Sequence, residues 1–222
     1  MQDFVAVTGI VIKTIPVGEY DRSVTILTKE RGKISAFARG ARRQTSRFSA
    51  AANPFSFGTF KLFAGRNSYN IMEADISNYF EGLRTDYENA CYGSYFLEIA
   101  DYYTRENNDE KEMLRLLYQS LRALESGRFQ GRLIRYIYEI KSIVVNGEFA
   151  GIPKEKEDDL EEASRYAVSF IVKSSVEKLY TFTVNDKVLA QLGQIAQESR
   201  KRTMDKSFKS LEVLDKMCVE KV

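Results

Sequence analysis

The sequence predicts an α+β protein in which a small five-stranded barrel is followed by a helical domain. Up to about residue 82, short segments rich in Val, Ile and Phe are separated by Gly, Pro and Asp, which is typical of strands and turns. From Thr85 onward, apolar residues recur at spacings of three and four, which indicates helices. We therefore expect residues 1–82 and 83–222 to form two domains.

Five strands are expected in the first domain: Phe4–Thr14, Ser23–Thr28, Gly32–Arg39, Phe55–Ala64 and Tyr69–Tyr79. The fourth strand carries apolar side chains on both faces, as a curved sheet that closes on itself requires. Five short strands suit the oligonucleotide/oligosaccharide-binding (OB) barrel, a fold that commonly binds single strands across one face and its loops.

A basic stripe covers residues 29–47, where seven lysines and arginines stand against one acid, Glu30, in a chain whose net charge is only +2. Read as a strand, Gly32–Arg39 places Ile34, Ala36 and Ala38 on one face and Lys33, Phe37 and Arg39 on the other. Cations interleaved with an aromatic ring are typical of a surface that binds single-stranded nucleic acid. The alternative is a merely solvated charged face.

The helical half begins with a predicted capping box, Thr85-Asp86-Tyr87-Glu88, and a helix that is apolar nearly all round. The next helix is expected to carry Met113 to Leu124, and a third Phe129 to Val144. On that third helix Arg128, Arg132 and Arg135 would form one stripe that fits an acidic peptide with a hydrophobic tip. The alternative is that Arg135 pairs with Glu139 and Arg132 faces solvent.

Two further charged segments follow. Residues 153–162 are acidic and predict an exposed linker or a short polar helix. A late basic cluster either extends a nucleic-acid path or is a solvated helix end; its members are Arg200, Lys201, Arg202, Lys206 and Lys209.

Several chemistries are disfavoured by composition. The sequence has no histidine, which removes Ser-His-Asp and Cys-His catalysis and histidine metal sites. It has neither of the glycine-rich phosphate-binding signatures, and its two cysteines, Cys91 and Cys218, are more typical of packing residues than of a disulfide or a zinc site. No apolar run is long enough for a membrane span, and the N-terminus does not read as a signal peptide. We expect a cytoplasmic protein that is not an enzyme, has no cofactor and does not bind membranes.

The N-terminal third resembles the bacterial DNA repair protein RecO family. Segments that follow the family pattern in order include Gly18-Glu19-Tyr20-Asp21-Arg22, Arg31-Gly32-Lys33-Ile34, Ala38-Arg39-Gly40-Ala41-Arg42-Arg43 and Pro54-Phe55. The likeness is looser through the helices, where Ser175-Val176-Glu177-Lys178-Leu179-Tyr180 is similar.

The resemblance implies an OB barrel joined to a helical domain that binds single- and double-stranded DNA and anneals complementary strands without covalent chemistry. It also implies work with RecR, and often RecF, to help RecA replace single-stranded DNA-binding protein (SSB). Some relatives bind the acidic, phenylalanine-ended SSB tail, and for that contact the arginine stripe supplies the candidates Arg128, Arg132 and Arg135. The basic stripe supplies the candidates for DNA: Lys33, Phe37, Arg39, Arg42, Arg43 and Arg47.

One departure from the family concerns metal. Many relatives carry a four-cysteine zinc module after a glycine that matches Gly147, whereas this sequence has no cysteine between 92 and 217. We expect a shortened, acidic and zinc-free segment at 148–174. Two other classes of function stay open from the residues alone: an OB-fold RNA-binding protein, and an adaptor whose basic loop contacts an acidic protein.

Overall fold

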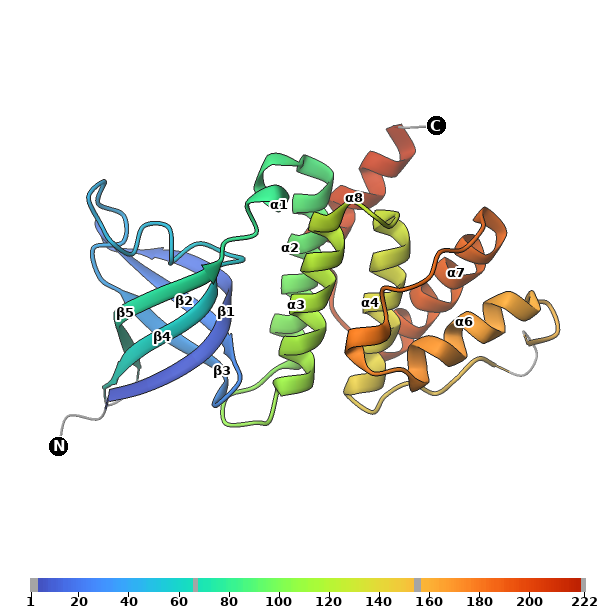
Figure 1. The fold of residues 1–222 in the computed structure, drawn as a ribbon, viewed down its shortest axis with the longest axis horizontal. Helices are drawn as coiled ribbons and strands as arrows, with labels where there is room; N and C mark the ends of the chain where they lie inside the picture. The colour runs from blue at the N-terminus through green and yellow to red at the C-terminus, as the bar shows by residue number, and fades with distance from the viewer. Residues whose placement is uncertain (1–3, 66–67, 154–156, 221–222) are drawn as a thin grey trace. The chain divides into compact units, whose positions relative to one another are not determined.

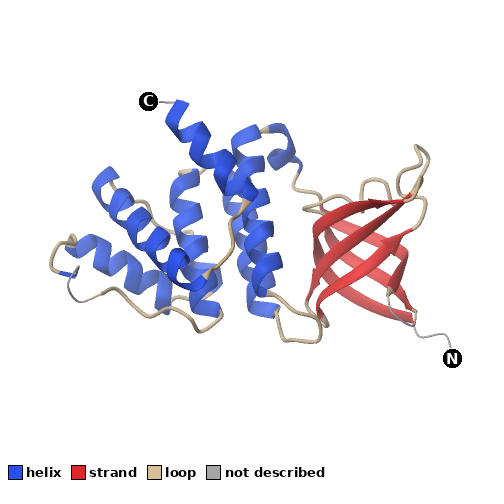
Figure 2. Cartoon of the chain, turned by 180° about the vertical axis from the view of Figure 1, so that it is seen from behind, coloured by secondary structure: helices blue, strands red, loops and turns tan. Residues whose placement is uncertain are grey.

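The computed structural model describes residues 4–65, 68–153 and 157–220. It divides the chain into two compact units, one made of residues 1–81 with 97–114 and the other of residues 82–96 with 115–222. The first unit contains a β-barrel and the second is helical, which confirms the predicted α+β class (Figures 1 and 2).

The barrel is closed by five strands in the order β1-β2-β3-β5-β4, with β4 paired back to β1. All neighbours are antiparallel except β3 and β5, which pair in parallel. This is the OB topology expected from the sequence. The strands are β1 Phe4–Val17, β2 Asp21–Thr28, β3 Gly32–Ala38, β4 Phe57–Ala64 and β5 Tyr69–Asn78.

Closure depends on β1, which pairs with β4 through its first half and with β2 through its second. Gly9 lies at the change of partner and faces Gly58 of β4. A Cβ at Gly9 would stand 2.4 Å from the Leu27 carbonyl oxygen, and one at Gly58 would stand 2.1 Å from that of Asp75. Only glycine permits these approaches, so the pair lets the sheet curve sharply enough to close.

The barrel interior is filled by the inward-facing side chains of all five strands, among them Val11, Ile26, Ile34, Phe60 and Ile71. Along β3, Ile34, Ala36 and Ala38 are buried, which confirms the predicted alternation. The following connection also contributes Ala41, Phe48 and Ala52 to this core. The connection is therefore packed onto the barrel, and its polar residues stand on a fixed base.

The helices of the chain are α1 Glu81–Thr85, α2 Tyr87–Tyr103, α3 Lys111–Ser126, α4 Gly131–Val145, α6 Glu162–Lys173, α7 Asp186–Thr203 and α8 Lys209–Glu220, with a 3₁₀ turn at Val176–Lys178. The predicted capping box is wrong in its N-cap. The Asp86 carboxylate accepts from the Asn89 amide at 3.0 Å, whereas the Thr85 hydroxyl donates to the Gly82 carbonyl within α1. Asp86 is one residue closer to the helix, and a carboxylate there also suits the positive end of the helix dipole.

A buried lysine fixes α6 in the helical unit. The Lys141 side chain is 7% exposed, and its Nζ donates to the carbonyl oxygens of Ile171, Val172 and Ser174 at 3.1, 3.1 and 2.7 Å. These carbonyls include those left without helical partners at the end of α6. Lys141 of α4 therefore caps α6 and neutralises its negative end.

The acidic segment is only partly described, because residues 154–156 lie outside the described ranges. Glu157, Asp158 and Asp159 are exposed, and α6 follows at Glu162. Within the described ranges, no helix combines the length and apolar character needed to cross a membrane.

Candidate nucleic-acid interface

The connection between β3 and β4, residues 39–56, is called the basic loop, and it is held on the barrel by buried side chains and by hydrogen bonds from β2. The Asp21 carboxylate accepts from the Gly40 amide at 2.7 Å, and Gly40 has a positive φ of 67° that suits glycine. Arg22 donates to the Ser49 carbonyl and the Asn53 side chain at 3.1 and 2.7 Å. These bonds fix the loop before any ligand arrives, which lowers the ordering cost of binding.

Two arginines of this loop lie against the β1–β2 turn. The Arg42 amide donates to the Tyr20 carbonyl at 2.9 Å, and its guanidinium donates to the Gly18 carbonyl at 3.0 Å. The Arg43 guanidinium lies over the Tyr20 ring, 4.7 Å from its centroid. Both arginines are exposed. A guanidinium has five N–H donors, so these contacts orient each group and leave donors for a phosphate.

Two more arginines contact the edge of β5. Arg39 donates to the Asn70 side chain at 3.1 Å, and Arg47 donates to the Met72 carbonyl at 2.7 Å. The Arg47 guanidinium also lies 4.8 Å from the centre of the Phe48 ring. We call Arg39, Arg42, Arg43 and Arg47, together with Tyr20, the arginine surface.

Lys33 stands apart from this surface. Its Nζ bonds the Asp101 carboxylate at 2.9 Å and the Asp101 carbonyl at 2.6 Å within the same unit. The Lys33 amide also donates to the Arg105 carbonyl, so this end of β3 is covered by the unit's own chain. Six residues of strand separate Lys33 from Arg39, roughly 20 Å. Phe37 lies between them on the outer face and is partly buried.

Tyr20 was not among the residues predicted from the sequence. Its side chain is 44% exposed on the turn between β1 and β2, and Ile15 and Val17 at the end of β1 are also exposed. A hydrogen bond with Glu19 raises the pKa of Tyr20 above its ordinary value, so the phenol stays neutral. The sequence offered one signal for Tyr20, namely its place in the first hairpin loop of the expected barrel, because that loop commonly contacts ligand in OB barrels.

The predicted arginine stripe of the helical unit is not continuous. Arg128 precedes α4, which begins at Gly131, so its placement on that helix was wrong. Arg135 is buried and donates to Glu139 at 3.1 Å and to Asp215 at 3.3 Å, which is the alternative pairing considered for it. Arg128 and Arg132 are exposed. The late basic cluster is also divided, because Arg200 turns inward toward Glu139 while its neighbours are exposed.

Chemically, the arginine surface offers fixed cations and an exposed ring rather than reactive groups. Among the described residues, no group of three or more Cys, Asp and Glu side chains is placed to hold a metal ion. Guanidinium groups bind phosphate through paired N–H bonds, and exposed rings stack on bases. The arrangement therefore suits a nucleic-acid strand that tracks from the β1–β2 turn to β5.

Comparison with known proteins gives two adjoining matches. Residues 1–80 match the family described as recombination protein O N terminal, and residues 84–149 match recombination protein O C terminal. The DNA repair protein RecO of Acetivibrio thermocellus is 28% identical over 243 residues, covering 96% of each chain. The RecO proteins of Bacillus pumilus and a Nocardioides species are 35% and 36% identical over 63% of this chain, and 54% and 58% of their own lengths are covered.

Proposed function

This chain belongs to the RecO family of DNA repair proteins, as its sequence resemblance predicted, and on that premise we propose that it is a DNA-binding recombination mediator. In this role it binds single- and double-stranded DNA, anneals complementary strands coated with SSB and, with RecR and RecF, assists RecA loading. It acts in the bacterial cytoplasm by binding alone, with no covalent step and no cofactor.

The observation that carries this proposal is the arginine surface. Four exposed guanidinium groups are oriented by hydrogen bonds or ring contacts around one end of the barrel. Phosphate contacts of this kind do not depend on the DNA sequence. A protein that acts on any gapped DNA requires this independence. We assign Arg39, Arg42, Arg43 and Arg47 to the phosphates and Phe37 to the outer edge of the path. Lys33 is given no role in DNA binding, because it is paired with Asp101.

For the SSB tail we propose Arg128 and Arg132. Both are exposed; Arg132 lies in the first turn of α4, and Arg128 lies three residues before the helix. Arg135 is left out of this contact because its guanidinium is occupied by Glu139 and Asp215. A tail with several carboxylates would meet the two remaining cations, and their loss should weaken the contact with SSB without changing the contact with bare DNA.

The test is annealing of two complementary oligonucleotides precoated with SSB, comparing intact SSB with SSB that lacks its acidic tail. We expect acceleration that depends on the tail and that Arg128→Ala with Arg132→Ala abolishes. The matched control is Arg122→Ala, which removes an exposed cation from α3. Annealing that does not depend on the tail would retain the DNA role and would remove Arg128 and Arg132 from the proposed contact with SSB. No annealing in either condition would favour the RNA-binding or adaptor alternatives.

Tyr20 gives a second prediction. Replacing Tyr20 by Leu should weaken binding of single-stranded DNA roughly tenfold, because one stacked base is lost. Duplex binding should weaken less, because only the contact that orients Arg43 is lost there. Fluorescence anisotropy with single-stranded and duplex oligonucleotides of one sequence measures both. Tyr87→Leu is the matched control, since Tyr87 is 68% exposed in the helical unit. Equal losses for both DNA forms would show that Tyr20 supports the fold of the turn and stacks on no base.

A further inference from the structure

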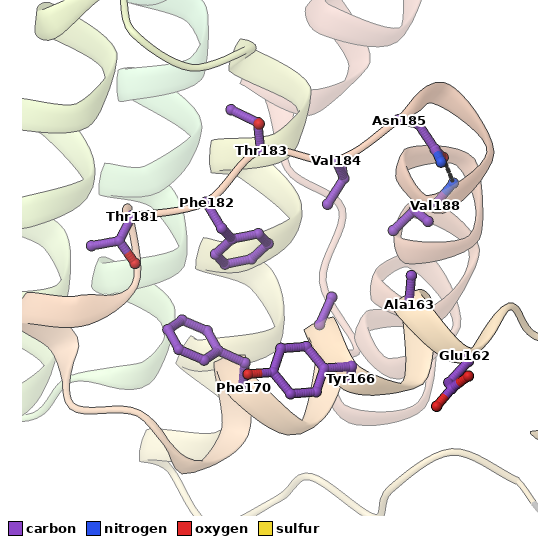
Figure 3. A pocket seen from close by; sticks show the side chains of 11 residues that line it. Glu162, Ala163, Tyr166, Phe170, Thr181, Phe182, Thr183, Val184, Asn185 and Val188 are labelled. Atoms are coloured by element: carbon purple, nitrogen blue, oxygen red, sulfur yellow. Dashed lines mark hydrogen bonds between the residues drawn. The ribbon is translucent and has the colours of Figure 1, made fainter.

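The helical unit contains an apolar pocket that the proposed DNA-binding role does not use. The cavity measures about 680 Å³, within the usual range of ligand pockets, and lies between α6, the start of α7 and the segment 181–185 (Figure 3). Its walls are mainly aromatic and aliphatic, with Tyr166 and Phe170 from α6, Phe182 and Val184 from the segment, and Val188 from α7.

The segment Thr181–Val184 forms one wall as an extended chain. Its side chains alternate in exposure, with Phe182 and Val184 partly buried and Thr181 and Thr183 exposed. Figure 3 shows Phe182 and Val184 on the side of α6, with Thr183 pointing away from it. Phe182 packs edge to face on Phe170, with ring centroids 5.3 Å apart. This contact holds the segment beside α6.

The backbone of this segment is unpaired. Among the described residues, none makes a main-chain hydrogen bond with the amides or carbonyls of Thr181, Phe182, Thr183 or Val184. A short extended segment with open backbone groups can accept a second strand, whose alternate side chains would then enter the same side as Phe182 and Val184. A peptide backbone is the ligand chemistry that completes both the strand edge and the apolar pocket.

The charged side chains near the pocket indicate which class of peptide would bind there. Glu162 is the one charged side chain among the described residues that line the pocket, and it is exposed in the first turn of α6. The exposed acids Glu157, Asp158 and Asp159 precede it in the chain. The neighbouring Glu161 is paired with Lys187, and Arg165 donates to the Glu157 carbonyl at 2.8 Å and does not line the pocket, so among the described residues Glu162 supplies the charge at the pocket. A carboxylate there disfavours an acidic peptide and favours a cationic one.

We propose that this pocket docks an extended protein segment that pairs with Thr181–Val184, inserts one large apolar or aromatic side chain between Tyr166 and Phe170, and places a lysine or arginine against Glu162. The site is separate from the arginine surface and from Arg128 and Arg132. Its charge preference is opposite to that of the SSB-tail contact.

The test uses a phage-displayed library of random heptapeptides selected on the immobilised full-length chain, followed by calorimetry with the enriched peptides. We expect sequences in which an apolar or aromatic residue is flanked by Lys or Arg. Ala163→Phe, at an exposed position that lines the pocket, should weaken their binding roughly tenfold or more by filling the cavity. Glu162→Lys should weaken cationic peptides and spare neutral ones.

Ala190→Phe is the matched control, because Ala190 is exposed on α7 and does not line the pocket. Enriched acidic peptides whose binding Ala163→Phe weakens, failure to enrich any cationic peptide, or cationic-peptide binding that Ala163→Phe leaves intact would each overturn the proposal. None of these outcomes bears on DNA binding, which is measured separately with oligonucleotides.

Discussion

Replacing Arg42 and Arg43 together by alanine is expected to weaken binding of single-stranded DNA roughly tenfold near physiological salt, whatever the DNA sequence. Both guanidinium groups are exposed and are oriented by the β1–β2 turn, where they can meet adjacent phosphates. Each lost phosphate contact should also reduce the magnitude of the salt slope by roughly 0.7 for a single strand. Affinities measured over a salt series give both quantities.

The control for this double variant is Lys173→Ala with Lys178→Ala, which removes the same charge from exposed positions in the helical unit. A thermal melt of each variant checks the fold, because Arg42 also bonds the Gly18 carbonyl. If the arginine variant keeps its affinity and slope, the loop is not the DNA site. If the lysine variant loses as much, the binding reflects net charge and not the arginine surface.

Much of the barrel could be predicted from the sequence, because strand alternation and turn residues are local patterns. Alternation along β3 identified the inward residues Ile34, Ala36 and Ala38, and turn residues marked the strand ends. The role of Gly9 and Gly58 in closing the barrel could not be predicted from the sequence, because it depends on β1 and β4 pairing at that point. The helix starts were less accurate: the chain uses Asp86 where Thr85 was expected, and α4 starts three residues beyond Arg128. Both errors lie at helix ends, where neighbouring residues compete to satisfy the same amides.

For the candidate site, too, local sequence signals found some residues and missed others. Arg39, Arg42, Arg43 and Arg47 are close in sequence, so composition alone brought them together. The partner of Lys33 is distant, since Asp101 lies 68 residues away, and no local pattern indicates that pairing. For Arg135, the i,i+4 spacing offered the pairing with Glu139 as an alternative, whereas Asp215, 80 residues away, could not be found from a local pattern. Tyr20 was missed for the same reason, because Arg43 reaches it only after β2 and β3 have folded back.

The pairing that removes Arg135 from the surface creates a buried polar network in the helical unit. Glu139 is fully buried and accepts from the Tyr95 hydroxyl at 2.6 Å and from Arg135, while Arg200 lies 3.9 Å away. Burial raises the pKa of Tyr95, and the Glu139 charge raises it further. Burial is the largest single influence on the pKa of Arg135 and would lower it, but Glu139, Tyr95 and Asp215 together raise that pKa above its ordinary value, so the guanidinium stays charged. With Asp215 the network joins α2, α4, α7 and α8.

Replacing Glu139 by leucine should therefore lower the free energy of unfolding by about 3–5 kcal/mol, because Arg135 and the Tyr95 hydroxyl lose their buried acceptor and Arg200 loses a nearby opposite charge. Urea denaturation of the full chain measures this change. The Glu139 Oε2 and the Arg200 Nε have no hydrogen-bond partner among the described residues, so the network is held by charge more than by paired bonds. Replacement with glutamine should consequently be nearly as harmful as replacement with leucine.

A double-mutant cycle separates the stability lost with the Arg135–Glu139 ion pair from the stability lost with the packing around Glu139. Arg135→Met combined with Glu139→Leu should recover part of the stability lost by Glu139→Leu alone, because an apolar pair leaves one fewer uncompensated charge. Glu212→Leu, at an exposed position on α8, serves as the control for removing a carboxylate. If the single and double variants are equally unstable, the cost arises from packing around Glu139. In that case the ion pair would contribute little to the free energy of unfolding, and packing would be the main reason that Arg135 is buried.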